Sequence, residues 1–300
     1  RDRSVSRGLG DVYKRQPLTW HQNMASLFSF GLLGYVIGCT KHEVIKISTD
    51  KGDFYVDNNC RGDTAQHIGT PETPDLVTAN PVFLSDNLDI VVSKDNIGVI
   101  IFKSCQNDVK DCLYNNVGAL KNCKGFIVDV RRNTGGGDYS CSAVASLFFD
   151  HPVEGGKCFT RVHNAWEFAN CKNNDLIALH DPPKRFTPPF CTDKPVVVLM
   201  GGCTASAAES FIIMMKNEQR AFFIGENSAG TTGQPMINSL PGGGSYAVCT
   251  QKGLTNEGVD YNNIGLEPDL YCHITLEDYQ KNYDRVMDKG LEYIRKLTGN

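Results

Sequence analysis

Short apolar runs alternate with stretches of helical spacing over most of this chain. Runs of strand length lie at residues 88–93, 97–102, 125–130, 195–200, 221–224, 246–250 and 270–274. Between or after them, apolar residues recur at helical spacing over residues 109–120, 139–149, 206–217 and 276–298. Buried strands that alternate with helices are typical of a layered α/β domain with largely parallel strand pairing. The pattern therefore predicts one α/β domain over residues 88–300.

In one long segment of this domain, the apolar residues follow neither strand nor helix spacing. Residues 151–193 are rich in proline, aromatic residues and cysteine. We predict a long loop there, and long loops in compact domains are often functional.

The chain before residue 88 follows a different pattern. Residues 20–38 predict an amphipathic helix, and residues 43–49 and 54–56 predict two strands joined by a turn. A helix and a hairpin bury too little apolar surface to fold alone, so we assign residues 17–57 to the last part of a small domain. Residues 58–87 are polar and contain three prolines, which predicts a linker.

The first sixteen residues do not read as natural sequence. Residues 6–16, SRGLGDVYKRQ, look like a translated sequencing adapter, so we interpret residues 1–16 as a non-native scar. We expect the natural sequence to begin near Pro17 in the middle of a longer protein. The whole chain has a net charge of −4, and residues 17–300 have −7, because the scar holds five basic and two acidic side chains. An acidic chain without a basic stripe argues against nucleic acid as a partner.

Twelve cysteines are scattered along the chain with no CxxC pair. Structural zinc sites usually contain closely paired ligands, so the spacing argues against a metal site. The even number fits disulfides in an exported protein, but several cysteines lie in apolar or helical runs, where buried thiols are equally expected. The cysteines therefore do not decide between an oxidising and a reducing compartment. Residues 24–39 are too short and too interrupted by Gly and Ser to span a membrane.

The most informative stretch of the chain is residues 195–230. An apolar strand leads through the small residues 201–205 into Ser206, where a helix begins. At a helix start, unpaired backbone N–H groups and the positive end of the helix dipole stabilise negative charge, such as that of an oxyanion. Ser206 is therefore a candidate nucleophile. The alternative is that Thr204 or Ser206 only caps the helix.

A second corner, rich in glycine, follows the strand at residues 125–130. Residues 131–137 read RRNTGGG, and a helix is predicted after them. Glycines at the carboxyl end of a strand let backbone N–H groups approach a ligand, and this edge of an α/β sheet is the usual binding site. The spacing does not match GxGxxG or GxxxxGK[ST], so a phosphate-binding loop is not indicated.

Five motifs in order resemble the C-terminal-processing (tail-specific) serine peptidase family, which includes tricorn-core and interphotoreceptor-retinoid-binding-protein-like branches. They are GFIVDVRRNTGGG (125–137), VVVLMGGCTASAAE (196–209), FIGENSAGTTGQP (223–235), SLPGGG (239–244) and IGLEPD (264–269). The resemblance covers roughly residues 88–298. It implies an α/β fold with a crotonase-like (ClpP/crotonase-type) ββα core, preceded by a PDZ-like domain of which residues 17–57 would be the remnant.

The resemblance also implies roles for single residues. Ser206, the serine of TAS, takes the place of the family nucleophile, which forms an acyl-enzyme with a peptide carbonyl. The oxyanion would be bound by the backbone N–H of Ala207 and by that of Gly135 or Gly136.

This chain departs from the family pattern at the general base. The processing-peptidase branch uses a lysine in a GKG context after a Gly–Glu pair, and Thr231 stands in that position here. Threonine cannot accept the proton of Ser206. In the tricorn-like branch the base is a histidine before the PDZ-like domain, and we expect that region to precede this chain. The other possibility is a family member that binds without hydrolysing.

The remaining candidates are weaker. Glu267, in IGLEPD, either orients that histidine or only forms a turn before Pro268. Thr231 and Gln234 are candidate substrate contacts, although an exposed Gln is the alternative for Gln234. Glu209, three residues after Ser206, is expected to cap the helix or to form a salt bridge.

We therefore predict an exported serine-type endopeptidase that acts on peptides or unfolded protein segments, with no metal or organic cofactor. The first alternative is a catalytically silent relative that binds a peptide or a hydrophobic ligand. The second is a crotonase-type acyl-CoA enzyme, which would share the core but has no need of a serine at a TAS corner. The sequence does not indicate the oligomeric state.

Overall fold

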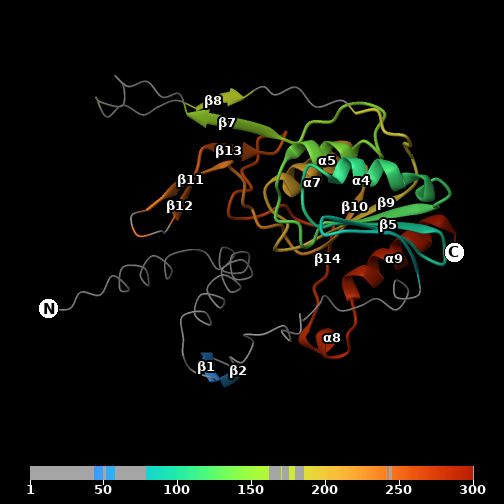
Figure 1. The fold of residues 1–300 in the computed structure, drawn as a ribbon, viewed down its shortest axis with the longest axis horizontal. Coiled ribbons are helices and arrows are strands. Elements are labelled where there is room, and N and C mark those ends of the chain that lie inside the picture. Colours follow the sequence, from blue (N-terminus) through green and yellow to red (C-terminus); the bar gives the residue numbers. More distant parts are fainter. Residues whose placement is uncertain are drawn as a thin grey trace.

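A computed structural model describes residues 44–49, 52–57, 79–161, 170, 176–179, 186–240, 242 and 245–299 (Figure 1). The adapter-like residues 1–16 and the helix expected over residues 20–38 lie outside these ranges. The expected hairpin is present, with β1 (Val44–Thr49) paired antiparallel to β2 (Gly52–Asp57). Whether it belongs to a PDZ-like domain stays a prediction.

The centre of the fold is a seven-stranded sheet with the order β14-β10-β9-β6-β5-β4-β3. The five strands from β14 to β5 are parallel, and β4 and β3 are added antiparallel at one edge. Their bounds are β3 (Asn80–Leu84), β4 (Leu88–Val92), β5 (Ile97–Phe102), β6 (Gly125–Asp129), β9 (Val196–Met200), β10 (Phe222–Gly225) and β14 (Leu270–Tyr271). The predicted parallel α/β architecture is thus present. The sheet begins earlier than expected, because β3 lies in the range assigned to the linker.

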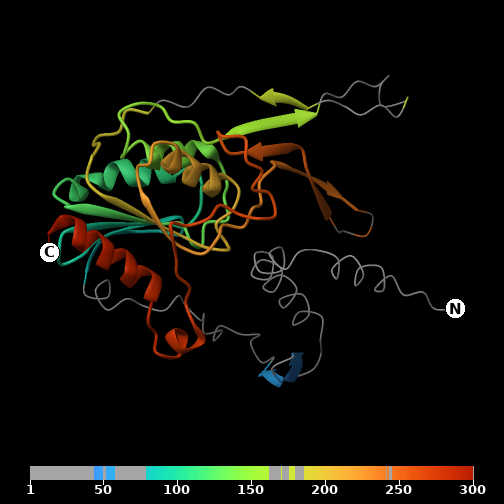
Figure 2. The ribbon, with the colours of Figure 1, turned by 180° about the vertical axis from the view of Figure 1, so that it is seen from behind.

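Helices cover both faces of the sheet (Figures 1 and 2). One face packs against α4 (Val109–Asn116), the short 3-10 helix η1 (Val117–Leu120), α5 (Asp138–Ala145) and α7 (Ala207–Asn217). The other face packs against α9 (Arg285–Thr298), which follows the short α8 (Leu276–Gln280). Every residue of β6 and β9 is buried, which explains why these strands are continuous apolar runs instead of alternating ones.

Parallel pairing brings the carboxyl ends of three strands together. Asp129 of β6 pairs with Leu199 of β9, and Met200 of β9 pairs with Gly225 of β10. The segments that follow these strands therefore leave the sheet at the same edge. They include the glycine corner (residues 131–137), the turn that carries Ser206 and the loop at residues 226–234.

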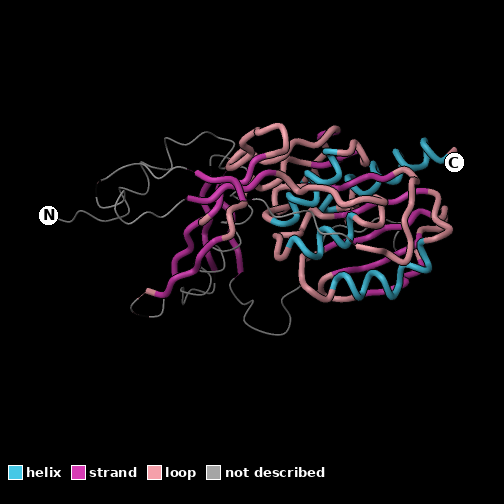
Figure 3. Tube along the Cα trace, turned by 90° about the horizontal axis from the view of Figure 1, so that it is seen from above, coloured by secondary structure: helices cyan, strands magenta, loops and turns pink. Residues whose placement is uncertain are grey.

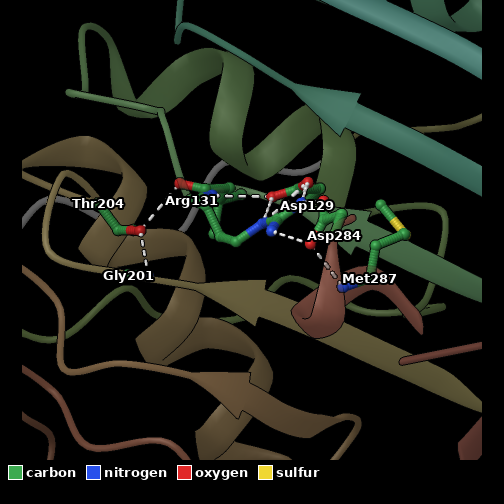
Figure 4. A network of polar contacts seen from close by, with 7 residues as sticks. Asp129, Arg131, Gly201, Thr204, Asp284 and Met287 are labelled. Atoms are coloured by element: carbon green, nitrogen blue, oxygen red, sulfur yellow. Dashed lines mark hydrogen bonds and ion pairs between the residues drawn. The ribbon is translucent and has the colours of Figure 1, made fainter. Parts of the chain in front are cut away.

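A buried ion-pair cluster fixes the start of the glycine corner (Figure 4). The Arg131 guanidinium donates to Asp129 through Nε at 3.0 Å and to Asp284 through Nη1 at 2.8 Å and Nη2 at 2.7 Å. Asp284 also caps α9 by accepting the Met287 N–H at 3.0 Å. Burial opposes the charge of Arg131, but the two carboxylates outweigh it and raise the pKa of the guanidinium. One side chain thus joins β6 and its corner to the helix on the opposite face.

Two smaller sheets lie to one side of this core (Figure 3). One is the hairpin β11 (Pro235–Ser239) and β12 (Ser245–Cys249). The other has the order β13-β7-β8, with β13 (Gln251–Leu254), β7 (Lys157–Arg161) and β8 (Leu176–Leu179). The prediction of a long loop over residues 151–193 is wrong where β7 and β8 form. No residue of these strands is fully buried, so they leave no hydrophobic period in the sequence.

Candidate active site

Ser206 lies at the sharp turn between β9 and α7, with its backbone in a strained conformation. Its φ of 56° and ψ of −123° are rare for a residue with a side chain. A strained strand-to-helix turn is how α/β-hydrolases present their nucleophilic serine. Ser206 is also the N-cap residue of α7, as the structural alternative expected. Its backbone conformation, however, is one that simple capping does not require.

The hydroxyl of Thr204 does not cap α7, because it joins two strands below the turn. It donates to the Val130 carbonyl at 2.8 Å and accepts the Gly201 N–H at 3.0 Å (Figure 4). Thr204 therefore ties the end of β6 to the turn after β9. Its contacts hold the two corners next to each other.

A buried carboxylate holds the Ser206 turn from behind. Glu209 Oε2 accepts the Ser206 N–H at 3.1 Å and the Thr231 N–H at 3.1 Å. Its Oε1 accepts the Ser228 hydroxyl at 2.5 Å and the Gly230 N–H at 2.7 Å. From the sequence, Glu209 was expected only to cap the helix or to form a salt bridge. It does cap the helix, and it also binds the loop after β10 to the candidate nucleophile.

The charge state of Glu209 reflects two opposing effects. Burial raises the pKa of the carboxyl to about 7, although the four hydrogen-bond donors favour the ionised form and lower it. Thr231 adds a further bond, because its carbonyl accepts the Ser206 N–H at 2.8 Å. The residue in the place of the family lysine thus contacts the turn through its backbone.

The glycine corner lies directly against the Ser206 turn. A Cβ on Gly135 would stand 2.7 Å from the Cβ of Ser206 and 3.2 Å from the Ala207 nitrogen, so glycine is required there. The Gly135 N–H already donates to Asn133 Oδ1 at 2.9 Å. Within the described part of the chain, the N–H groups of Gly136 and Ala207 have no hydrogen-bond acceptor. Of the three donors expected from the sequence, these two remain candidates for binding an oxyanion.

The structure places the other predicted site residues around this centre. The side chain of Glu267 is exposed, and its neighbour Leu266 donates its N–H to Ser228 at 2.7 Å. Gln234 is also exposed, and its side chain accepts a hydrogen bond from Gln251 of β13. Neither side chain hydrogen-bonds to Ser206. The orienting role of Glu267 and the substrate contact of Gln234 therefore stay predictions.

None of the described histidines or lysines hydrogen-bonds to Ser206. His151 is exposed, and the hydrogen bond that its ring donates to the Asp150 carboxylate raises its pKa. His273 is exposed and lies against Tyr271. The other five histidines are outside the described residues. In the same described ranges, no cluster of three or more His, Cys, Asp or Glu side chains could hold a metal ion, and no helix has the length and apolarity to cross a membrane.

The raised pKa of Glu209 predicts a dependence of stability on pH. Between pH 4.5 and about 7 the carboxyl ionises in the unfolded chain but stays protonated in the folded one, so the folded state binds more protons and stability falls as pH rises. Relative to Glu209→Gln, the wild type should lose roughly 3 kcal/mol of unfolding free energy over this range. Urea unfolding of both proteins at several pH values measures it. A relative gain in stability with rising pH would show that the four donors outweigh burial.

Comparison with known proteins agrees with this geometry. The profile of Peptidase family S41 matches residues 96–272. A carboxy-terminal-processing protease of Bartonella bacilliformis is 26% identical over 240 residues, which are 73% of this chain and 51% of that protein. The carboxy-terminal processing protease CtpA of Bacillus subtilis is 25% identical, over 65% of this chain and 41% of that protein. The chain thus spans about half the length of these relatives, or less.

Solved structures share the fold at low identity. A crystal structure of a candidate peptidase from Parabacteroides merdae has a TM-score of 0.58 at 20% identity, over 88% of this chain and 82% of that one. Mature CPAF has a TM-score of 0.55 at 15% identity, over 85% of this chain and 66% of that one. The profile covers more than half of the chain, including both corners. The resemblance to C-terminal-processing peptidases is therefore confirmed, and the chain belongs to Peptidase family S41.

Proposed function

We propose that this chain carries the catalytic domain of a serine-type endopeptidase that cleaves peptides or unfolded protein segments. The observation that carries the proposal is the strained Ser206 turn, which lies against the glycine corner, together with the unpaired N–H groups of Ala207 in that turn and Gly136 in that corner. Family membership and the names of the relatives support the same activity. By the same likeness, we expect an exported protein.

Ser206 Oγ would attack the carbonyl carbon of the scissile peptide bond and form an acyl-enzyme, which water then hydrolyses. The N–H groups of Ala207 and Gly136 would bind the oxyanion that forms during attack. We favour Gly136 over Gly135 because the Gly135 N–H is already bonded to Asn133. Donors fixed in place before the reaction stabilise the transition state without reorganisation. Thr231 and Gln234, in the loop after β10, would contact the substrate.

The general base would be a histidine that is supplied from a segment before residue 17. Thr231 occupies the lysine position of the processing peptidases, and its side chain cannot accept a proton at neutral pH. A histidine has a suitable pKa and needs only hydrogen-bond reach of Ser206 Oγ. Glu267 would orient this histidine from the loop that Leu266 anchors to Ser228.

A second candidate function is a catalytically silent module that binds a peptide or a hydrophobic ligand. It is favoured by one observation, the lack of a described histidine or lysine hydrogen-bonded to Ser206. Such a protein would bind peptide equally well with Ser206 or with alanine at that position. It would show no turnover under any condition.

Labelling by a fluorophosphonate probe separates the two functions. In the natural full-length protein, the probe should form an adduct on Ser206, located by peptide mass spectrometry, and Ser206→Ala should abolish it. Ser210→Ala is a matched control, because this serine lies one turn further along α7. Labelling should survive in that variant. The peptidase proposal is wrong if the full-length wild type is not labelled at Ser206.

Substitutions at two glycines of the glycine corner test whether it belongs to the active site. Gly135→Ala places a methyl group 2.7 Å from the Ser206 Cβ and should slow acylation at least about 100-fold, because Ser206 and the Ala207 N–H are displaced. Gly137→Ala places its methyl 3.7 Å from the Cys105 carbonyl, in ordinary contact, and should leave the rate within a few-fold. Thermal unfolding of both variants controls for folding. Equal rates in the two variants would exclude this corner from the site.

Comparing the hydrolysis rates of a shorter and a full-length protein tests which part of the sequence supplies the general base. Residues 17–300 alone should hydrolyse an unfolded protein substrate at least about 100-fold more slowly than the natural full-length protein, since general base catalysis contributes about that factor or more. Thermal unfolding checks that the shorter protein is folded. Comparable hydrolysis by the two proteins would place the base within residues 17–300.

A further inference from the structure

Two cysteine thiols lie against each other beneath the glycine corner. Cys105 follows β5, Cys141 lies in α5, and their sulfur atoms are 3.2 Å apart. The two residues are 36 positions apart in the sequence, and both are buried. Their approach is therefore set by the packing of α5 on the sheet.

The backbone of Cys105 is joined to the glycine corner. Its N–H donates to the Gly135 carbonyl at 2.9 Å, and its carbonyl accepts the Gly137 N–H at 2.8 Å. Between these bonds, Gly136 forms a parallel bridge with Cys105, and a Cβ on Gly136 would stand 2.5 Å from the Cys105 carbonyl oxygen. The position of Cys105 thus fixes the position of the corner.

The two thiols donate to acceptors in both corners. Cys105 Sγ donates to Asn133 Oδ1 at 3.3 Å, and Cys141 Sγ donates to the Ala207 carbonyl at 3.0 Å. Asn133 Oδ1 also accepts the Gly135 N–H, and the Ala207 carbonyl lies in the first turn of α7, where the helix supplies an N–H four residues later. Loss of both S–H donors would therefore leave neither acceptor unsatisfied.

We propose that Cys105 and Cys141 form a disulfide that links the support of the glycine corner to α5. The sulfurs need to approach by only about 1.1 Å to reach the disulfide length of about 2.05 Å. The co-reactant is a low-molecular-weight disulfide such as oxidised glutathione. One thiolate attacks it and releases one reduced thiol, and the second thiolate attacks the mixed disulfide and releases the other. Two protein thiols are oxidised and one small disulfide is reduced to two thiols.

The exchange takes place during folding, before the core closes. In the folded protein, burial is the main cause that raises the pKa of the Cys141 thiol, so the attacking thiolate is scarce and shielded from the co-reactant. In the unfolded chain both thiols are exposed and exchange freely. Closure of the core then protects the bond that has formed.

Mass spectrometry of the wild type tests this directly. The reduced, unfolded protein is refolded in a glutathione redox buffer or in excess reductant, then denatured, alkylated and digested. We expect the Cys105 and Cys141 peptides to be linked after refolding in the redox buffer and alkylated after refolding with reductant. Cys123, another buried cysteine, should be alkylated in both. Alkylated Cys105 and Cys141 after refolding in the redox buffer would overturn the proposal.

Thermal unfolding provides a second readout that uses no catalysis. The oxidised wild type should melt about 5–10 °C above the reduced protein, because the disulfide restricts the unfolded chain. The difference should persist in Cys123→Ala and disappear in the double variant Cys105→Ala/Cys141→Ala. A difference that persists in the double variant assigns the stabilisation to other cysteines and overturns the assignment. Neither readout depends on peptidase activity.

Discussion

The candidate site depends on the hydrogen bonds of one group, the buried carboxylate of Glu209. It accepts hydrogen bonds from Ser206, Ser228, Gly230 and Thr231, so the Ser206 turn and the loop after β10 share one anchor. A strained residue such as Ser206 persists only when its surroundings fix it more firmly than its own backbone preference. A buried carboxylate is costly unless its oxygens are paired, and here each oxygen has two donors. The same four bonds therefore offset part of the cost of burying the charge, and they hold the strained turn.

Parallel strand pairing explains why these groups can meet at all. The glycine corner, the Ser206 turn and the loop after β10 follow three adjacent strands and leave the sheet at one edge. Thr204 ties two of the strands together below the corner, and Arg131 joins the corner to α9 on the opposite face. Bonds to the sheet and to both helical layers thus restrain the site, which is what preorganised catalysis requires.

The proposed site for acyl transfer is more complete in this chain than the groups that would transfer the proton. The chain has the serine, its strained turn and two unpaired N–H donors, but the position of the family lysine holds Thr231. The Thr231 backbone has a structural role there, since its N–H binds Glu209 and its carbonyl binds the Ser206 N–H. This position can therefore be important to the fold of the site in a peptidase and in a silent binding protein alike. The source of the base decides between them.

The sequence by itself determined the layered α/β core and indicated Ser206 as the candidate nucleophile. Strands such as β5 and β9 are buried on both faces, so burial leaves a hydrophobic run that can be read locally. Strands such as β3, β8 and β11 are mostly exposed and leave no such signal, and they were missed. Only the tertiary structure decided the contacts of Glu209, the pairing of the Gly135 N–H with Asn133, and the contact of Cys105 with Cys141. These depend on hydrogen bonds and packing between segments far apart in the chain, whereas hydrophobic periodicity reports only how neighbouring residues are buried.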